Sequence, residues 1–351
     1  MRHILALALG TVLAGAPAAL AIAAPAPAST PRNAFGQPDL SGAWSNATLT
    51  PLTRNRRISD KATLGAAEAR ALEARWAKAL ADSDDTSAAK TSADLVEQTK
   101  KSDLAAIRPD FVAAGGDTGG YNTFWIDPGT HLVEINGEYR TAILTTPDGM
   151  PPKMKPGAPL AAGFGSRRDV YDNYEDRSLG ERCISGFGRN AAPPMLPNGY
   201  YNNNYQIVQT KDNVAIVVEL IHDVRMVRLN SQHRTDGVRP VMGDSIGRYE
   251  GNTLVVETTN LPERDNFMGA WRNTKITERF TRVAPDKIVY GFTVEDPDVW
   301  AQPWGGEMTF QPLKGGVFEY ACHEGNYALP GILAGARAKE KEKATRTGAA
   351  N

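Results

Sequence analysis

The sequence has little cysteine and no excess of charge of either sign. Its 351 residues include two cysteines, and 39 Lys and Arg stand against 40 Asp and Glu. Two cysteines are too few for a disulfide scaffold or an all-cysteine zinc site. A net charge of −1 argues against nucleic acid as a partner, because polyanions bind basic surfaces. The composition is that of a near-neutral globular protein, and the length allows two domains or one large all-β domain.

Common enzyme signatures are also absent. The sequence contains no Walker loop, no Rossmann glycine fingerprint, no His-Glu-x-x-His pair and no Gly-x-Ser-x-Gly elbow. No two histidines have the His-x-His spacing that places both imidazoles on one face of a strand. We therefore predict no cofactor and no metal site. Chemistry assembled from scattered positions on a sheet stays open.

The first 28 residues have the pattern of a secretory signal and a flexible lead. Arg2 supplies the positive charge, Ile4–Leu13 form a short apolar run, and Ala19–Ala21 form a cleavage site. The run is shorter than the roughly 20 residues that span a membrane. We predict cleavage after Ala21 and a periplasmic or secreted protein that is not stably inserted in a membrane.

Beyond the lead, the spacing of apolar residues changes from helical to strand-like near residue 121. Residues 29–120 are predicted to be a helical segment that packs on the rest, because apolar side chains recur every three or four positions through Leu64–Leu80. A weaker helix is predicted over Leu95–Ile107. From residue 121 to 330 short strands follow one another: His131–Ile135, Glu138–Thr146, Tyr205–Gln209, Val214–His222, Arg225–Leu229, Ile246–Glu250, Thr253–Thr259, Ile276–Val283, Lys287–Val294, Glu307–Gln311 and Val317–Cys322.

Tight turns link most of these strands, for example at Asn136-Gly137, which suits a type I′ hairpin. Such connections are too short for helical crossovers, so the sheet is predicted to be antiparallel. A sheet of this size must curl, and an up-and-down barrel removes its edges. A β-sandwich is the alternative. Residues 331–351 are predicted to form a short helix and a tail.

Several segments resemble those of a large family of secreted, mostly uncharacterised bacterial proteins. They are Pro38–Trp44 (PDLSGAW), Tyr174–Cys183 (YEDRSLGERC), Tyr201–Ile207 (YNNNYQI), Glu219–Arg225 (ELIHDVR), Met242–Gly251 (MGDSIGRYEG) and Glu319–Tyr327 (EYACHEGNY). The resemblance covers nearly all of the mature chain. It implies a lipocalin-like (calycin-type) β-barrel and no particular reaction.

Export changes what Cys183 and Cys322 predict. In an oxidising compartment an even pair of cysteines most simply forms one disulfide. The alternative is that Cys322, beside His323, is a thiol nucleophile. The disulfide is the prediction that we carry forward.

Charged residues interrupt the apolar strand pair from Val214 to Arg228. If alternation continues without a bulge, Glu219, Asp223 and Arg225 share one face. Charges on such a face must be solvated or paired, because an unpaired buried charge is costly. Two interpretations remain: a polar cluster inside a barrel pocket, or a salt bridge on the outer face.

His222 and His323 are the candidate proton carriers. Imidazole titrates near neutral pH, and a carboxylate, Asp223 or Glu324, follows each of them. Because neighbours on a strand point to opposite faces, each histidine needs a further partner. A Cys183–Cys322 bridge would bring three such partners, Glu175, Asp176 and Arg177, close to His323. The alternative for each histidine is a structural hydrogen bond at a strand end.

Aromatic and amide side chains predict an organic ligand. Tyr and Trp combine an apolar body with a polar tip, and an Asn amide both donates and accepts hydrogen bonds. The candidate binding residues are Glu175, Arg177, Tyr201, Asn203, Tyr205, Glu219, Trp304 and Tyr327. The alternative for Trp304, with Trp300, is that the pair closes one end of the barrel.

These observations predict an exported barrel enzyme that acts on a small, partly apolar organic molecule. The reaction class is a cofactor-independent lyase, isomerase or hydrolase that uses general acid–base catalysis. His222 or His323 would carry the proton, Asp223 or Glu324 would orient it, and Arg225 would stabilise negative charge. The alternatives are a non-catalytic carrier of a hydrophobic ligand and a structural envelope protein. The oligomeric state is not predicted.

Overall fold

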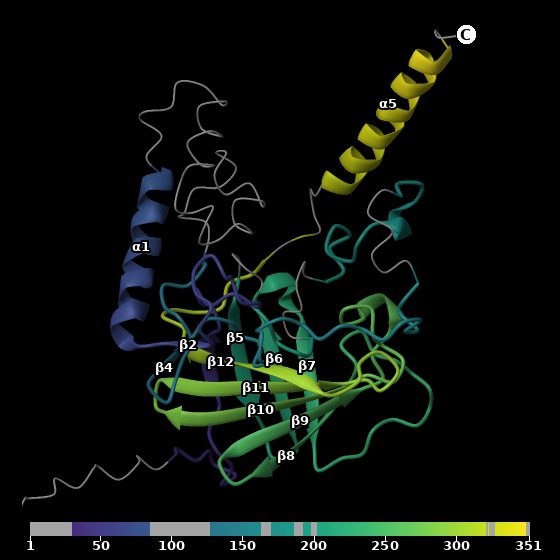
Figure 1. The fold of residues 1–351 in the computed structure, drawn as a ribbon. Helices are drawn as coiled ribbons and strands as arrows, with labels where there is room; N and C mark the ends of the chain where they lie inside the picture. Colours follow the sequence, from purple (N-terminus) through teal and green to yellow (C-terminus); the bar gives the residue numbers. More distant parts are fainter. Residues whose placement is uncertain are drawn as a thin grey trace, which may run out of the picture.

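Nine strands close into a barrel in the computed structural model, which describes residues 30–84, 127–162, 170–185, 192–197, 202–320, 322 and 327–348 (Figure 1). The mainly β fold with a barrel and a C-terminal helix is therefore confirmed. Around the barrel the strands are β1 (Gly42–Ser45), β12 (Trp304–Pro312), β11 (Lys287–Glu295), β10 (Lys275–Ala284), β9 (Thr253–Thr259), β8 (Asp244–Glu250), β7 (Val224–Leu229), β6 (Asn213–Val218) and β5 (Asn204–Gln209).

Side chains fill the inside of the barrel. The strands alternate, so that Ile276, Glu278 and Phe280 of β10 are fully buried while Arg279 lies outside. Aromatic rings occupy much of the interior, and Tyr290 and Phe310 are each 0% exposed. Facing residues from the other strands complete this core: Trp44, Tyr205, Ile207, Val214, Ile216, Val218, Val227, Leu254, Val256, Ile288, Phe292, Val294 and Met308.

One pair of neighbouring strands departs from the predicted antiparallel order. β7 and β8 are parallel, with Val227 opposite Ser245. Residues 230–243 make this possible, because they return along the barrel so that β8 starts at the end where β7 starts. His233 lies in this connection. Its Nδ1 is 3.1 Å from Oδ2 of Asp244, and its Nε2 is 3.1 Å from Oε1 of Glu257. Parallel pairing of sequential strands needs a long return, and this connection provides it without a helix.

The bounds of other predicted elements differ from those in the structure. The strand predicted over Val214–His222 stops at Val218, since Ile221 and His222 adopt positive φ angles of 62° and 47° in the short helix η3 (Leu220–His222). Residues 317–320 of the strand predicted over Val317–Cys322 are not a strand. The physical reason is that β1 already pairs with both β5 and β12, which closes the barrel. The helix predicted over residues 95–107 lies outside the described residues.

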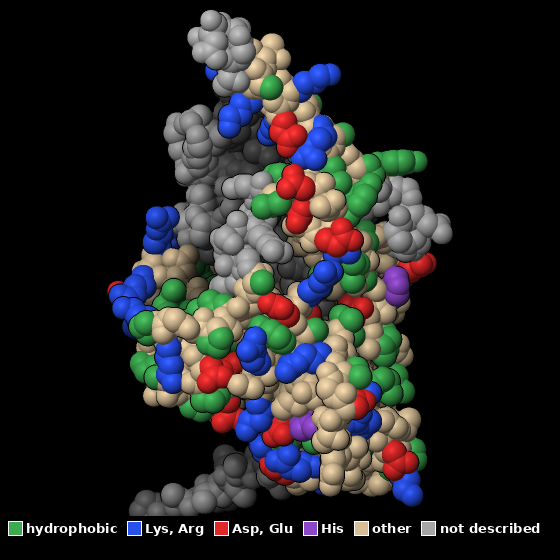
Figure 2. All heavy atoms as spheres, turned by 90° about the vertical axis from the view of Figure 1, so that its right-hand side faces the viewer, with side chains coloured by type: hydrophobic (Ala, Val, Ile, Leu, Met, Phe, Trp, Pro, Cys, Tyr) green, Lys and Arg blue, Asp and Glu red, His purple; other side chains and the backbone are tan. Residues whose placement is uncertain are grey.

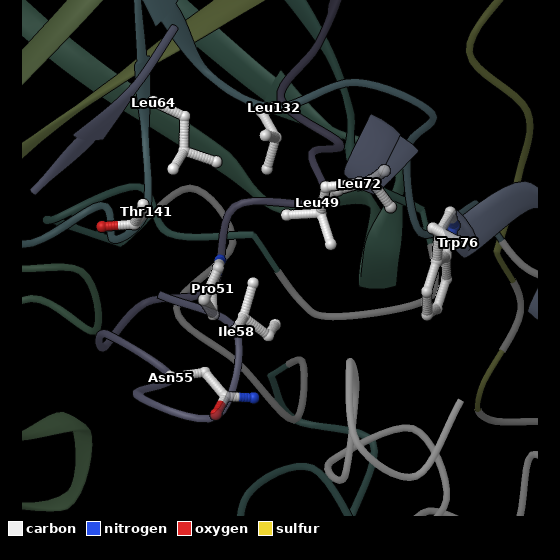
Figure 3. A pocket seen from close by; sticks show the side chains of 9 residues that line it. All are labelled: Leu49, Pro51, Asn55, Ile58, Leu64, Leu72, Trp76, Leu132 and Thr141. Carbon is white, nitrogen blue, oxygen red and sulfur yellow. The ribbon is translucent and has the colours of Figure 1, made fainter. Parts of the chain in front are cut away.

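A small sheet and the helix α1 (Ala66–Asp84) lie beside the barrel (Figure 1). The sheet contains β2 (Thr63–Leu64), β4 (Glu138–Arg140) and β3 (Glu134–Ile135) in that order. Trp76 of α1, 2% exposed, packs in a second core with Leu49, Leu64 and Leu132. Figure 3 shows these side chains around a cavity of about 20 Å³, which is room for about one or two water molecules. The second core is therefore nearly filled.

Close backbone contact joins the barrel to residues 143–145. Glu307 N–H donates to Ile143 O at 2.9 Å, and Thr145 N–H donates to Gly305 O at 3.0 Å. A Cβ atom on Gly306 would lie 2.6 Å from Ile143 O and 2.7 Å from the Phe292 ring. The lack of a side chain at Gly306 is what allows this approach.

The C-terminal helix α5 (Ala328–Gly348) is confirmed as a helix and projects away from the barrel (Figure 1). Its side chains are largely exposed. Arg337 donates a hydrogen bond to Tyr171 O at 3.0 Å, so α5 contacts the segment before the short helix η2 (Tyr174–Asp176). A third short helix, η4 (Glu263–Asp265), follows β9.

Candidate functional site

A fully buried ion pair crosses the barrel interior between β7 and β10. Nη1 of Arg225 lies 2.8 Å from Oε2 of Glu278, and its Nη2 lies 3.1 Å from Oε1. The hydroxyl of Tyr290 donates to Oε1 of the same carboxylate at 2.8 Å. Arg225 is 2% exposed and Glu278 0%. Burial and the negative charge of Glu278 raise the pKa of Tyr290, so Tyr290 is a hydrogen-bond donor here and not an acid.

Residues 192–197, which we call the plug, are held onto this ion pair. The backbone N–H of Met195 donates to the Tyr290 hydroxyl at 2.8 Å, and Nη2 of Arg225 lies 3.4 Å from Met195 Sδ. Nδ2 of Asn46 donates to Met195 O at 3.4 Å and to the Tyr205 hydroxyl at 3.3 Å. Met195 is 0% exposed. The interior polar groups thus hold the plug in place and do not open to solvent.

The rim is the barrel end at which β6, β9 and β11 finish and β7, β10 and β12 begin. Glu219 follows β6 there and is 5% exposed. Its carboxylate accepts hydrogen bonds from Asn202 at 2.6 Å, Asn204 at 3.2 Å and the backbone N–H of Phe318 at 3.1 Å. Three donors compensate for the cost of burying this charge. Glu219 therefore ties the start of β5 to the segment that leads to Cys322.

Asp223 is a rim residue with a strongly shifted pKa. Partial burial raises the pKa of its carboxyl to about 6, with a further contribution from the negative charge of Asp265 in η4; the neighbouring His222 opposes both. His222 itself is exposed. A carboxyl that titrates near 6 is present in both protonation states near neutral pH, so it can donate or accept a proton.

This pKa predicts a pH-dependent stability. A carboxyl whose pKa is raised on folding favours the folded state at low pH, and this contribution is lost as the pH rises from 3.8 through about 6. One pKa unit corresponds to about 1.4 kcal/mol, and solvent screening reduces the effect for a partly exposed group. We expect Asp223→Asn to increase the free energy of unfolding by about 1–2 kcal/mol at pH 7 and to leave it unchanged at pH 4. Urea unfolding at both pH values measures this, and an equal change at both would contradict it.

A disulfide joins Cys183 and Cys322, as predicted, with a sulfur–sulfur distance of 2.20 Å. In the segment before Cys183, Arg177 is paired with Glu181 at 2.7 Å and lies 4.2 Å from the centre of the Tyr171 ring. Glu175 is exposed. The predicted residues Tyr201, His323 and Glu324 lie outside the described residues, so their predicted roles stay predictions.

The remaining predicted residues are spread over the barrel. Tyr205 is buried in the plug network, and burial raises its pKa. Asn203, 1% exposed, donates to Asp127 O at 3.3 Å. Trp304 stacks on Phe267 with ring centres 5.8 Å apart and meets Trp300 edge-on at 5.3 Å. Tyr327 is 81% exposed.

The structure separates the three charged residues that strand alternation placed on one face. The turn at η3 lies between β6 and β7, so Glu219 and Asp223 are at the rim while Arg225 points into the barrel. The alternation missed two partners, Glu278 and Asp265. Glu278 had a readable signal, since it shares the face of Ile276 and Phe280. Asp265 had none, because a loop residue carries no periodicity.

The described residues contain no group of three or more His, Cys, Asp and Glu that could hold a metal ion. Within the same ranges no helix is long and apolar enough to cross a membrane. Lys, Arg, Asp and Glu side chains are intermixed on the face that Figure 2 shows. That mixture agrees with the near-zero net charge of the sequence.

No protein-family model matches the sequence. The comparison with curated proteins also finds no match. Among solved structures, a mutant of the fluorescent protein UnaG aligns with 16% identity over 38% of this chain and 86% of that chain, with a TM-score of 0.22. A likeness at this TM-score carries no argument. Membership in the secreted bacterial family therefore stays a prediction.

Proposed function

We propose that the protein is an exported barrel enzyme whose rim carries out general acid–base catalysis on a small, partly apolar organic molecule. The observation that carries the proposal is the half-buried carboxyl of Asp223. Burial and the negative charge of Asp265 raise its pKa to about 6, against the opposing effect of His222. A partly buried carboxyl with a raised pKa is typical of acid–base sites. The reaction class would be a lyase, isomerase or hydrolase without a cofactor.

The proposal gives each rim residue a part. Asp223 carries the proton, and the exposed imidazole of His222 beside it is a second carrier. Glu219, held by Asn202 and Asn204, positions the strand ends around them. Arg225 is bonded to Glu278, so the proposal gives it a structural part in place of the charge-stabilising part expected from sequence.

Two observations bear on location and on the alternative function. The Cys183–Cys322 disulfide supports export, because such bonds persist in oxidising compartments. A carrier of a hydrophobic ligand needs an open apolar lumen, whereas Tyr290, Phe280 and Phe310 fill this barrel. We therefore favour the enzyme over the carrier.

The test uses nitrobenzisoxazole, a small, partly apolar compound that eliminates when a base removes its ring proton. We expect the full-length protein to accelerate this reaction, with a rate that rises with pH around an apparent pKa of about 6, which is the pKa of Asp223. Asp223→Asn should lower the rate about a hundredfold, the lower end of what general bases contribute. His222→Ala should lower it less.

The matched control is Asp60→Asn, because Asp60 is an exposed carboxylate away from the barrel rim. Its rate and pH profile should equal those of the unmodified protein. If Asp223→Asn folds and keeps the full rate, the carboxyl is not the base and the proposal fails. The proposal also fails if the variant is slower but its pH–rate profile keeps a midpoint near pH 6.

A further inference from the structure

A second cavity lies on the flank of the barrel, between α1, the small sheet and the outer wall. Its volume is about 320 Å³, which falls within the size range of ligand sites. We call it the flank cavity. Its lining residues are Arg70, Glu73, His131, Leu132, Glu134, Tyr139, Lys287, Thr309 and Gln311.

Both carboxylates of the flank cavity already accept hydrogen bonds from backbone N–H groups. Glu73 accepts a hydrogen bond from the backbone N–H of Leu132 at 2.9 Å and lies 3.5 Å from Nδ1 of His131. Glu134 is ion-paired with Lys287 and accepts a hydrogen bond from Gly137 N–H at 2.6 Å. Each carboxylate of the lining therefore already has a donor within the protein.

Several lining side chains keep free hydrogen-bonding groups, and three of them carry the argument. Throughout the described part of the chain, Arg70, Tyr139 and Gln311 have no side-chain hydrogen bond or ion pair. Arg70 comes from α1, Tyr139 from β4 and Gln311 from the outer face of β12, so the three approach the cavity from different elements. Of the two permanent cations in the lining, Lys287 is paired with Glu134 and Arg70 makes no ion pair within the described residues.

We infer that the flank cavity binds a small hydroxylated carboxylate, such as a sugar acid. A free guanidinium suits a carboxylate group, which it can bind through two parallel hydrogen bonds. The phenol of Tyr139 and the amide of Gln311 both donate and accept hydrogen bonds, as ligand hydroxyl groups require. Lys287 begins β11 at the barrel end opposite the rim, so this site is separate from Asp223 and does not depend on the proposed function.

The probe is glucuronate, titrated calorimetrically into the full-length protein, with glucose as the neutral comparison. We expect saturable binding of glucuronate with a Kd of about 1 mM and at least tenfold weaker binding of glucose. Arg70→Gln should weaken glucuronate binding about tenfold or more, since it removes a charge-assisted pair. Gln311→Ala should weaken the binding of both sugars alike.

The matched control is Arg56→Gln, because Arg56 is exposed and does not line the cavity. This variant should bind glucuronate as the unmodified protein does. Arg70 is exposed, so its replacement should leave the thermal midpoint unchanged. Asp223→Asn should also bind normally. Absence of saturation, equal affinity for glucose and glucuronate, an effect of Arg56→Gln equal to that of Arg70→Gln, or loss of binding in Asp223→Asn would each overturn the inference.

Discussion

Replacement of Cys183 and Cys322 together by serine is expected to lower the free energy of unfolding by about 4 kcal/mol. The bridge spans 139 residues of sequence, and this interval contains β5 to β12, which is eight of the nine barrel strands. A cross-link over so long a loop removes much of the conformational entropy of the unfolded chain. The double variant should therefore unfold at a markedly lower urea concentration.

Reduction of the unmodified protein is the matched control for this prediction. Dithiothreitol should lower its stability to that of the double variant, and the double variant should not respond to dithiothreitol. If reduction and replacement both change the free energy of unfolding by less than about 1 kcal/mol, the bridge does not restrain the barrel. The rim contacts of Glu219 with Asn202 and Phe318 would then suffice to hold the ends of this interval together.

The residues of the turns made most of the barrel strands predictable, but they did not predict which strands pair to close the barrel. The barrel turns at residues 210–212, 251–252 and 285–286 are two or three residues long, as predicted from their sequences. The predicted hairpin at Asn136 and Gly137, with φ angles of 56° and 81°, has type I′ geometry but belongs to the small sheet and not to the barrel. β1 has four residues and no local turn signal, yet it pairs with both β5 and β12. Because that pairing joins residues far apart in the chain, no periodicity in the segment reveals it. The false strand over Val317–Cys322 has the same origin.

The candidate site was predictable only in part, for a related reason. Glu219, His222 and Asp223 stood out because charges interrupt an apolar strand. Strand alternation correctly indicated that Glu219 and Arg225 need partners, but the partner of Arg225 is Glu278, 53 residues further on. Which residues meet across a barrel depends on its shear and strand number, and neither can be read from local sequence.

Arg225→Met is expected to lower the free energy of unfolding by about 3–5 kcal/mol. The substitution leaves the carboxylate of Glu278 at 0% exposure without its cation, and the remaining donor from Tyr290 cannot compensate for a full charge. Met195 also loses its contact with Nη2 of Arg225, so the plug should loosen. Urea unfolding followed by tryptophan fluorescence measures both effects, because Trp300 and Trp304 lie in the same core.

The neighbouring ion pair on the outer face is the control. Arg279 and Glu250 lie 3.0 Å apart, with side chains 50% and 40% exposed. Solvent screens such a pair, so Arg279→Gln should cost at most about 1 kcal/mol. The same strand thus carries a buried pair and an exposed pair at adjacent positions, and the difference between the two variants isolates burial as the cause.

The double variant Arg225→Met/Glu278→Leu separates the loss of a partner from the value of the pair itself. Apolar residues of similar volume remove both charges, so we expect most of the stability lost in Arg225→Met to return. The buried Tyr290 hydroxyl loses its acceptor, which should leave the double variant about 1–3 kcal/mol less stable than the unmodified protein. Tyr290 would keep its hydrogen bond from Met195 N–H, which preserves the plug. If the double variant is instead as unstable as Arg225→Met, the ion pair stabilises the barrel more than an apolar pair of similar volume does. The bidentate geometry with the Tyr290 hydroxyl would then be the source of that extra stability.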